Sequence, residues 1–236
     1  MAPFRDHGNN NQRAMFEGLE EKNPGKSYLK YFDDLIAKHL DMGNAAIKVR
    51  DEQKYKLKTI CHGDPWFNNM MFKYKDGDKL DDIIFIDFQM VGYTSPSLDL
   101  VYFLGSSTTG DLRKKYLPHI LTLYHTIFIN AVERLGVTVD FSYEDLLDDF
   151  RKARVHGLNF AITAIPSILA ENTEDIIDTE EWIKAMNEEN EEIRNQKMKE
   201  IMDQQDAHFN ASDVMGSRIR DLVDECIEAG DVMEGL

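Results

Sequence analysis

Three oxygen-bearing side chains stand in an order that suits phosphoryl transfer. Asp64 lies two residues after His62 in a His-Gly-Asp loop, and Asn69 follows five residues after Asp64. A further carboxylate, Asp87, ends an apolar run over residues 83–86. Phosphoryl transfer needs one positioned carboxylate for the acceptor and oxygen ligands for Mg²⁺ beside the phosphates. The pattern therefore predicts Asp64 as the catalytic base, and Asn69 and Asp87 as ligands of Mg²⁺ bound to nucleotide phosphates.

Each of these residues also has a simpler explanation when it is taken alone. Asp64 could cap a turn, Asn69 could be a turn residue, and Asp87 could cap the end of a strand. Their joint order, followed by a short hairpin and an apolar strand, favours the functional interpretation. Gly63 is expected to allow a backbone geometry that a larger residue would resist.

Two neighbouring residues have open roles. His62 is a candidate catalytic residue, and the alternative is an imidazole that only holds the loop through hydrogen bonds. Asp99, in the segment Ser-Pro-Ser-Leu-Asp-Leu, is a candidate buried carboxylate that reaches back to the loop. The simpler alternative for Asp99 is a cap at the entry to a helix.

Short strands and helices are predicted to position these residues. Residues 70–74 and 83–86 predict a hairpin whose connecting loop is longer than two residues. A helix is predicted from Ser27, which would be its N-cap, and another over residues 112–135 with Pro118 in its first turn and Gly136 at its end. Ser142 and Asp145 resemble a capping box that opens a further helix.

These elements predict an α+β fold that is mostly helical. Residues 1–26 are expected to be loose, because they combine an Asn-rich stretch with a Pro-Gly pair. Residues 27–236 are expected to form one domain. A last helix is predicted within residues 214–232.

Composition excludes several classes of protein. The formal net charge of −16 argues against nucleic acid and anionic membranes as main partners, because both require clustered Lys and Arg. No signal peptide or membrane-spanning run is visible, so we expect a cytoplasmic protein. The two cysteines, Cys61 and Cys226, are too few for a disulfide framework. The sequence does not indicate an oligomeric state.

Residues 62–69, Asp87-Phe88-Gln89 and residues 95–100 resemble the choline-kinase and aminoglycoside-phosphotransferase superfamily, and in particular its ecdysteroid kinase-like group. That group's loop reads His-Gly-Asp-x-Trp-x-x-Asn, as residues 62–69 do here, with Pro65 as a departure. The resemblance implies a protein-kinase-like large lobe that uses ATP and Mg²⁺. It also implies Met71 and Ile86 as the apolar floor under an adenine, although two buried strand residues would give the same pattern. The acceptor would be a small-molecule alcohol, sterol-like or otherwise lipophilic.

The front of the chain departs from that family pattern. Ala-Ala-Ile-Lys, ending at Lys48, looks like the strand motif that carries the phosphate-contacting lysine, but it lies only fourteen residues before His62 and follows no glycine-rich loop. We therefore expect a large lobe without its N-terminal nucleotide lobe, with weak or no activity alone. The alternative function is a non-catalytic binding or regulatory protein. A metal-dependent phosphohydrolase that uses His62, Asp64 and Asp87 is a weaker third possibility.

Overall fold

The structure is a computed structural model. It describes residues 2–39, 48–51, 53–169 and 213–229, together with residues 184–185, 187–188, 190, 192–197 and 199–201. The chain divides into two compact units, one formed by residues 1–45 and 162–227 and the other by residues 46–161 and 228–236. Each unit is described by itself. No helix in the described part of the chain is long and apolar enough to cross a membrane.

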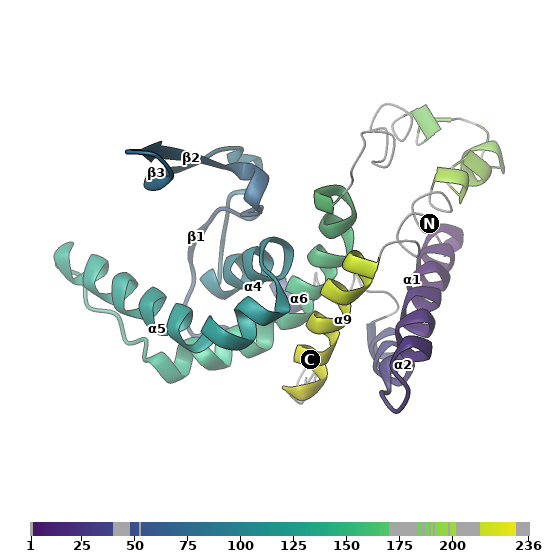
Figure 1. The fold of residues 1–236 in the computed structure, drawn as a ribbon, viewed down its shortest axis with the longest axis horizontal. Helices are drawn as coiled ribbons and strands as arrows, with labels where there is room; N and C mark the ends of the chain where they lie inside the picture. The colour runs from purple at the N-terminus through teal and green to yellow at the C-terminus, as the bar shows by residue number, and fades with distance from the viewer. Residues whose placement is uncertain are drawn as a thin grey trace. The chain divides into compact units, whose positions relative to one another are not determined.

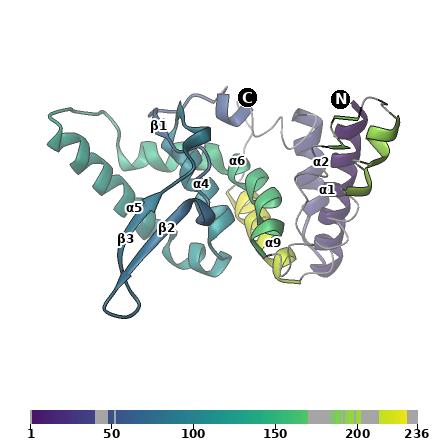
Figure 2. The same ribbon diagram turned by 90° about the horizontal axis from the view of Figure 1, so that it is seen from above.

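The first unit contains helices α1 (Ala2–Lys22), α2 (Tyr28–His39) and α9 (Asp213–Glu228). Helices α1 and α2 lie side by side (Figures 1 and 2). The ring of Phe16 packs against that of Phe32 at 5.0 Å, and both side chains are buried. The predicted looseness of residues 1–26 is therefore wrong, because the apolar side chains in the second half of α1 pack against α2.

Helix α2 begins where the sequence predicted, since Tyr31 N donates to the Ser27 carbonyl as the first helical hydrogen bond. A side chain from α1 also stabilises this start: Glu20 Oε2 accepts from Leu29 N at 2.8 Å. A carboxylate there also interacts favourably with the helix dipole. Helix α9 forms as predicted and buries Ile219 and Val223.

The second unit carries two small antiparallel sheets. Strand β1 (Thr59–Cys61) pairs with β4 (Gly92–Thr94), and β2 (Met70–Lys75) pairs with β3 (Lys79–Phe85). The β2–β3 hairpin confirms the prediction, with a three-residue turn over 76–78 and an irregularity between Lys73 and Tyr74. Figure 2 shows this hairpin projecting from the rest of its unit. The pairing of β1 with β4 was not predicted.

Helices α4 (Pro96–Ser107), α5 (Gly110–Arg134) and α6 (Tyr143–Leu169) follow, α6 running on into the first unit. The structure confirms the mostly helical α+β prediction. Gly136 ends α5 with a φ of 73°, and its N–H donates to the Glu133 carbonyl. The capping box is also confirmed, because Asp145 N donates to Ser142 Oγ and Ser142 N donates to Asp145 Oδ2.

The placement of Pro118 in a first helical turn is wrong. Helix α5 begins at Gly110, after Thr109 whose side chain accepts from Leu112 N, so Pro118 lies inside the helix. Residues 48–51 are helical, so Lys48 does not lie on a strand as the kinase lysine would.

Candidate active site

A carboxylate on α4 holds the loop that carries Asp64. Asp99 Oδ2 accepts from His62 N at 2.7 Å, and Asp99 Oδ1 accepts from Gly63 N at 3.0 Å. The cap of α4 is supplied by Ser95, whose side chain accepts from Ser97 N. The prediction that Asp99 reaches back to the loop is therefore confirmed, and the cap alternative is wrong. Burial raises the pKa of Asp99, while the two backbone donors act in the opposite direction.

Gly63 is required by its surroundings. Its φ is +84°, in the left-handed region that favours glycine. A Cβ at this position would lie 2.1 Å from the carbonyl oxygen of Met90. The expectation that Gly63 permits a geometry closed to larger residues is therefore confirmed.

Both ring nitrogens of His62 serve the loop. His62 Nδ1 accepts from Asp64 N at 3.3 Å, so Nε2 carries the proton and donates to the Ile86 carbonyl at 2.9 Å. The ring also packs against Phe85 and Phe88, with ring centroids 5.7 and 4.9 Å away. These contacts match the architectural role for His62 more closely than the catalytic one.

The carboxylate of Asp64 is bound at both oxygens. Asn69 Nδ2 donates to Asp64 Oδ2 at 2.8 Å and to the Asp64 carbonyl at 2.9 Å. The Tyr102 hydroxyl donates to Asp64 Oδ1 at 2.5 Å. Sequence reasoning missed Tyr102. The available signal was its spacing, because a residue three positions after Asp99 on a helix shares its face.

The hairpin connects Asn69 with Asp87. Ile86 N donates to the Asn69 carbonyl at 3.0 Å, and Asp87 is the next residue. Asp87 has a left-handed backbone (φ 63°, ψ 65°), which is uncommon for a residue other than glycine. Within the described residues, the side chain of Asp87 accepts one long hydrogen bond, 3.4 Å from Gln89 Nε2. Asp64 is thus hydrogen-bonded to Asn69, and Asn69 is hydrogen-bonded to Ile86, the residue directly before Asp87.

The donor set fits Mg²⁺. Asn69 is buried, and because its Nδ2 atom is bound to Asp64, Oδ1 is the atom that could bind a cation. Asp87 offers an exposed carboxylate. Mg²⁺ prefers oxygen ligands and normally takes only one or two from the protein, with water and phosphate completing the octahedron. The described residues contain no group of three or more His, Cys, Asp or Glu side chains that could hold a metal ion, so they offer no support for the phosphohydrolase alternative.

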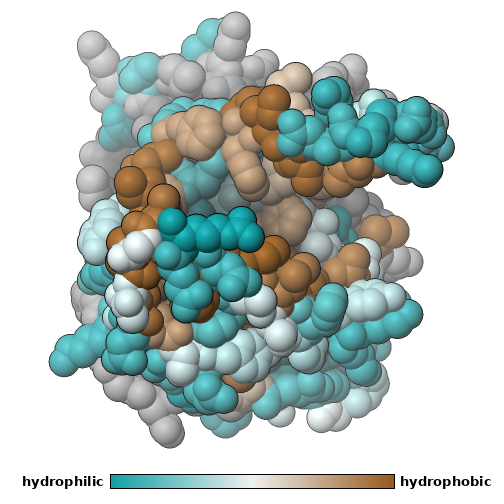
Figure 3. Space-filling model, turned by 90° about the vertical axis from the view of Figure 1, so that its left-hand side faces the viewer, coloured by the Kyte–Doolittle hydropathy of each residue, from teal (hydrophilic) through white to brown (hydrophobic). Residues whose placement is uncertain are grey.

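Met71 and Ile86 are exposed, with 60% and 37% of their surface accessible. The alternative in which they are two buried strand residues is therefore wrong. Met71 lies opposite Ile84 in the β2–β3 ladder, so the two share one face of the hairpin, and Ile86 follows directly after the end of β3. On the other face, Phe72 stacks on Phe67 of the loop at 4.8 Å. Figure 3, which views the molecule from the left-hand side of Figure 1, shows apolar side chains at that surface.

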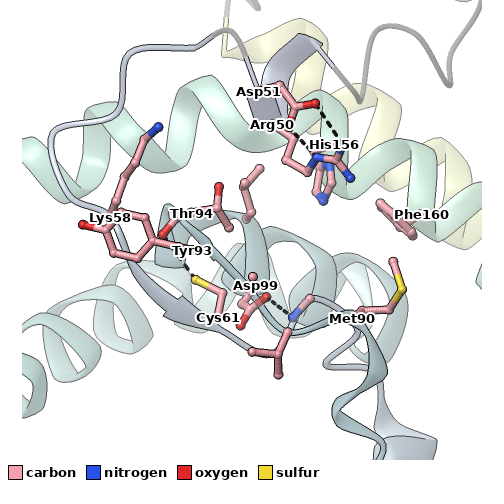
Figure 4. Close-up of a pocket in the computed structure, with 14 residues that line it drawn as sticks. Arg50, Asp51, Lys58, Cys61, Met90, Tyr93, Thr94, Asp99, His156 and Phe160 are labelled. Carbon is pink, nitrogen blue, oxygen red and sulfur yellow. Dashed lines mark hydrogen bonds and ion pairs between the residues drawn. The ribbon is translucent and has the colours of Figure 1, made fainter.

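A cavity of about 430 Å³ is lined in part by Gly63 of the loop and by Asp99 (Figure 4). Its lining mixes cationic side chains, such as Arg50 and Lys58, with the apolar Phe160. Arg50 is paired with Asp51, with Nε and Oδ1 2.6 Å apart. The volume is in the range of small-molecule sites.

Comparison with known proteins decides the family. A profile of the ecdysteroid kinase-like family matches residues 2–137. This chain belongs to the ecdysteroid kinase-like family. No curated protein and no solved structure matches the chain. The matched region of this ecdysteroid kinase-like protein contains the His-Gly-Asp loop, the hairpin and Asp87, and it includes α1, which the sequence resemblance had left outside. Membership implies kinase-like phosphotransferase chemistry on a small molecule.

Proposed function

We propose that this chain is an ATP- and Mg²⁺-dependent phosphotransferase that acts on an alcohol group of a small molecule. The observation that supports this most directly is the fixed carboxylate of Asp64. It lies on a loop bound to Asp99 and is linked through Asn69 to the strand end that carries Asp87. A phosphoryl-transfer site needs this combination of one aimed carboxylate and nearby oxygen ligands.

Asp64 acts as the catalytic base in this proposal. Its carboxylate accepts a hydrogen bond from the acceptor hydroxyl and orients that oxygen toward the γ-phosphorus. The bond from the acceptor oxygen to phosphorus forms, the bond to the departing ADP oxygen breaks, and the hydroxyl proton passes to Asp64. His62 keeps the loop in shape through its two ring nitrogens and does not transfer a proton.

Asn69 Oδ1 and the Asp87 carboxylate would hold Mg²⁺, which neutralises charge on the nucleotide phosphates when bound. The exposed face of the hairpin with Met71, together with Ile86, serves as the floor for the adenine. The acceptor in this proposal is a sterol-like or other lipophilic alcohol. The two free cysteines, Cys61 and Cys226, fit a reducing compartment such as the cytoplasm, where ATP is supplied.

Transfer of labelled γ-phosphate from ATP to a panel of alcohols, sterols among them, tests the proposal. The wild-type chain should show a Mg²⁺-dependent thermal shift with ATP and label at least one alcohol, at the low rate expected from the sequence. Asp64→Ala should abolish the transfer, and Asp87→Asn should remove the Mg²⁺-dependent shift. The control is Asp78→Ala, in the exposed turn of the hairpin, which should behave as the wild type.

Absence of both the thermal shift and the transfer in the wild-type chain would contradict this function. That result would favour the alternative of a non-catalytic kinase-like binding or regulatory protein. Transfer that survives Asp64→Ala would contradict the role of Asp64 while leaving the phosphotransferase activity standing.

A further inference from the structure

We propose that Tyr102 is a positioning residue that aims the Asp64 carboxylate at the acceptor oxygen. This inference rests on the proposed phosphotransferase function. It assigns a role to a side chain on α4 that lies outside both the His-Gly-Asp loop and the Asp-Phe-Gln segment.

The first support is the way in which the carboxylate is bound. Tyr102 donates to Asp64 Oδ1 and Asn69 donates to Asp64 Oδ2, at 2.5 and 2.8 Å. An aspartate side chain can rotate about its last bond, and a donor on each oxygen fixes the plane of the carboxylate. Each oxygen retains a second lone pair, so the group can still accept a hydrogen bond from an alcohol. The Tyr102 bond therefore sets direction without blocking the base.

The second support is that Tyr102 is itself fixed. Its side chain is 5% exposed, and its ring stacks on Phe160 with centroids 4.4 Å apart. The carbonyl of Tyr102 accepts from Ser106 Oγ at 2.8 Å. Burial, and then the bond to Asp64, raise the pKa of Tyr102, so the hydroxyl remains a protonated donor. A donor that cannot move is suited to preorganising a base.

The third support is that α4 contacts the loop at three points. Asp99 binds the backbone at His62 and Gly63, Tyr102 binds the Asp64 carboxylate, and Ser107 Oγ accepts from Phe67 N at 3.0 Å. These residues lie about one turn apart or slightly more along the same helix. A single stiff element thus fixes the backbone of the loop and the direction of its carboxylate together.

A purely structural role would mean that the Asp64 carboxylate only satisfies a buried hydroxyl. The chain offers a matched case of that kind. The Tyr28 hydroxyl donates to Asp224 Oδ1 at 3.0 Å within the first unit, whereas the loop belongs to the second unit. The substitutions Tyr102→Phe and Tyr28→Phe each remove one hydroxyl and keep the ring.

The first experiment measures Mg²⁺-dependent ATP hydrolysis, because water can replace an acceptor that is not identified. The water oxygen bonds to the γ-phosphorus, the bond to the ADP oxygen breaks, and the water proton passes to Asp64. Tyr102→Phe should lower kcat by roughly 10- to 100-fold, as expected for a lost hydrogen bond to a charged group, and leave KM for ATP within about twofold. Tyr28→Phe should leave both unchanged. Equal kcat for Tyr102→Phe and the wild type would overturn the proposal.

A double-mutant cycle on unfolding tests the bond without any turnover. Each substitution raises the equilibrium constant of unfolding by some factor. For Tyr102→Phe with Asp64→Ala, the factor of the double variant should be about tenfold smaller than the product of the two single factors. For Tyr28→Phe with Asp64→Ala, it should equal that product. A multiplicative cycle for Tyr102 would overturn the proposal.

The two proposals fail in different ways. If the wild-type chain shows no thermal shift with Mg²⁺ and ATP and does not hydrolyse ATP, the phosphotransferase function is contradicted. If the double-mutant cycle still shows coupling in that case, the bond of Tyr102 to Asp64 is only a structural contact. Turnover that is normal in Tyr102→Phe but lost in Asp64→Ala contradicts the positioning role alone.

Discussion

The His-Gly-Asp loop and the β2–β3 hairpin differ sharply in how they are held, although they adjoin one another. The loop is bound by three residues of α4: Asp99, Tyr102 and Ser107. Every residue of β3 is exposed, and β2 has no buried residue. The hairpin contacts the loop through the hydrogen bond from Ile86 N to the Asn69 carbonyl and through ring contacts of Phe72 and Phe85.

This difference matches the different demands of the two regions. A catalytic base must be aimed within a fraction of an ångström, so its loop needs rigid support. A surface that receives the flat ring of an adenine needs area and accessibility instead. Asp87 lies just beyond the base of the hairpin and is exposed, which suits the ligand role proposed for its carboxylate.

The largest expected difference lies between two glycines with the same backbone conformation. Gly63 and Gly77 have φ values of +84° and +85°, but only at Gly63 would a Cβ meet a backbone atom, 2.1 Å from Met90 O. Gly63→Ala should lower the free energy of unfolding by about 3–5 kcal/mol, and Gly77→Ala by about 1 kcal/mol. Urea denaturation measures both. Equal losses would show that the loop is no more rigid than the hairpin turn.

Removing the anchor of the loop should have the next largest effect. Asp99→Ala leaves the N–H groups of His62 and Gly63 without their acceptor and should destabilise the chain by about 2–4 kcal/mol. It should also accelerate amide hydrogen exchange at these two residues more than anywhere in the hairpin. Unchanged exchange there would mean that α4 does not hold the loop.

Substitutions on the hairpin should cost little stability but should affect nucleotide binding. Ile84→Ser changes a side chain that is 59% exposed on the face shared with Met71. We expect a stability change within about 0.5 kcal/mol and a several-fold weaker affinity for Mg²⁺-ATP. Ile83→Ser, on the opposite face of the same strand, is the control and should leave affinity unchanged. Equal effects of both substitutions would contradict the adenine floor.

A last comparison needs no substitution and concerns the thiol of Cys61, the residue directly before the loop. Burial raises the pKa of Cys61 to about 12, and Asp99 adds to the shift. At pH 8 only about one thiol in 10,000 is then ionised, so iodoacetamide should modify Cys61 far more slowly than in the urea-unfolded chain. Peptide mass spectrometry follows the reaction. Rapid modification in the native chain would show that the loop region opens readily.

Sequence spacing predicted the support of the loop because its parts are local, whereas the catalytic and metal-binding roles stay predictions. The roles of Asp99 and Gly63 followed from residue type and position within short segments. The sequence did not predict α1, since the Asn-rich stretch hid the packing of Met15, Phe16 and Leu19, all buried, in the following turns. Helix packing outweighs weak local propensity in such a segment.

The long-range contacts were beyond sequence reasoning for a physical reason. Strands β1 and β4 have three residues each and lie about thirty residues apart, so no periodic pattern marks their pairing. The contact of Tyr102 with Asp64 depends on the rotation of α4 against the loop, which only the folded packing sets. The place of Pro118 was wrong because Pro118 is the ninth residue of α5, which begins at Gly110, and a first turn has only about four.

The β1–β4 pairing has a consequence for how this family can diversify. Cys61 lies opposite Gly92, so the segment between these two residues leaves the sheet and returns to it at the same point. Asp64, Asn69 and Asp87 all belong to this segment. Insertions in the hairpin turn over residues 76–78 would lengthen the segment without moving its two ends. The three oxygen-bearing side chains thus lie in one continuous segment between two short paired strands, and a new scaffold would also have to supply the contacts that α4 makes with the loop.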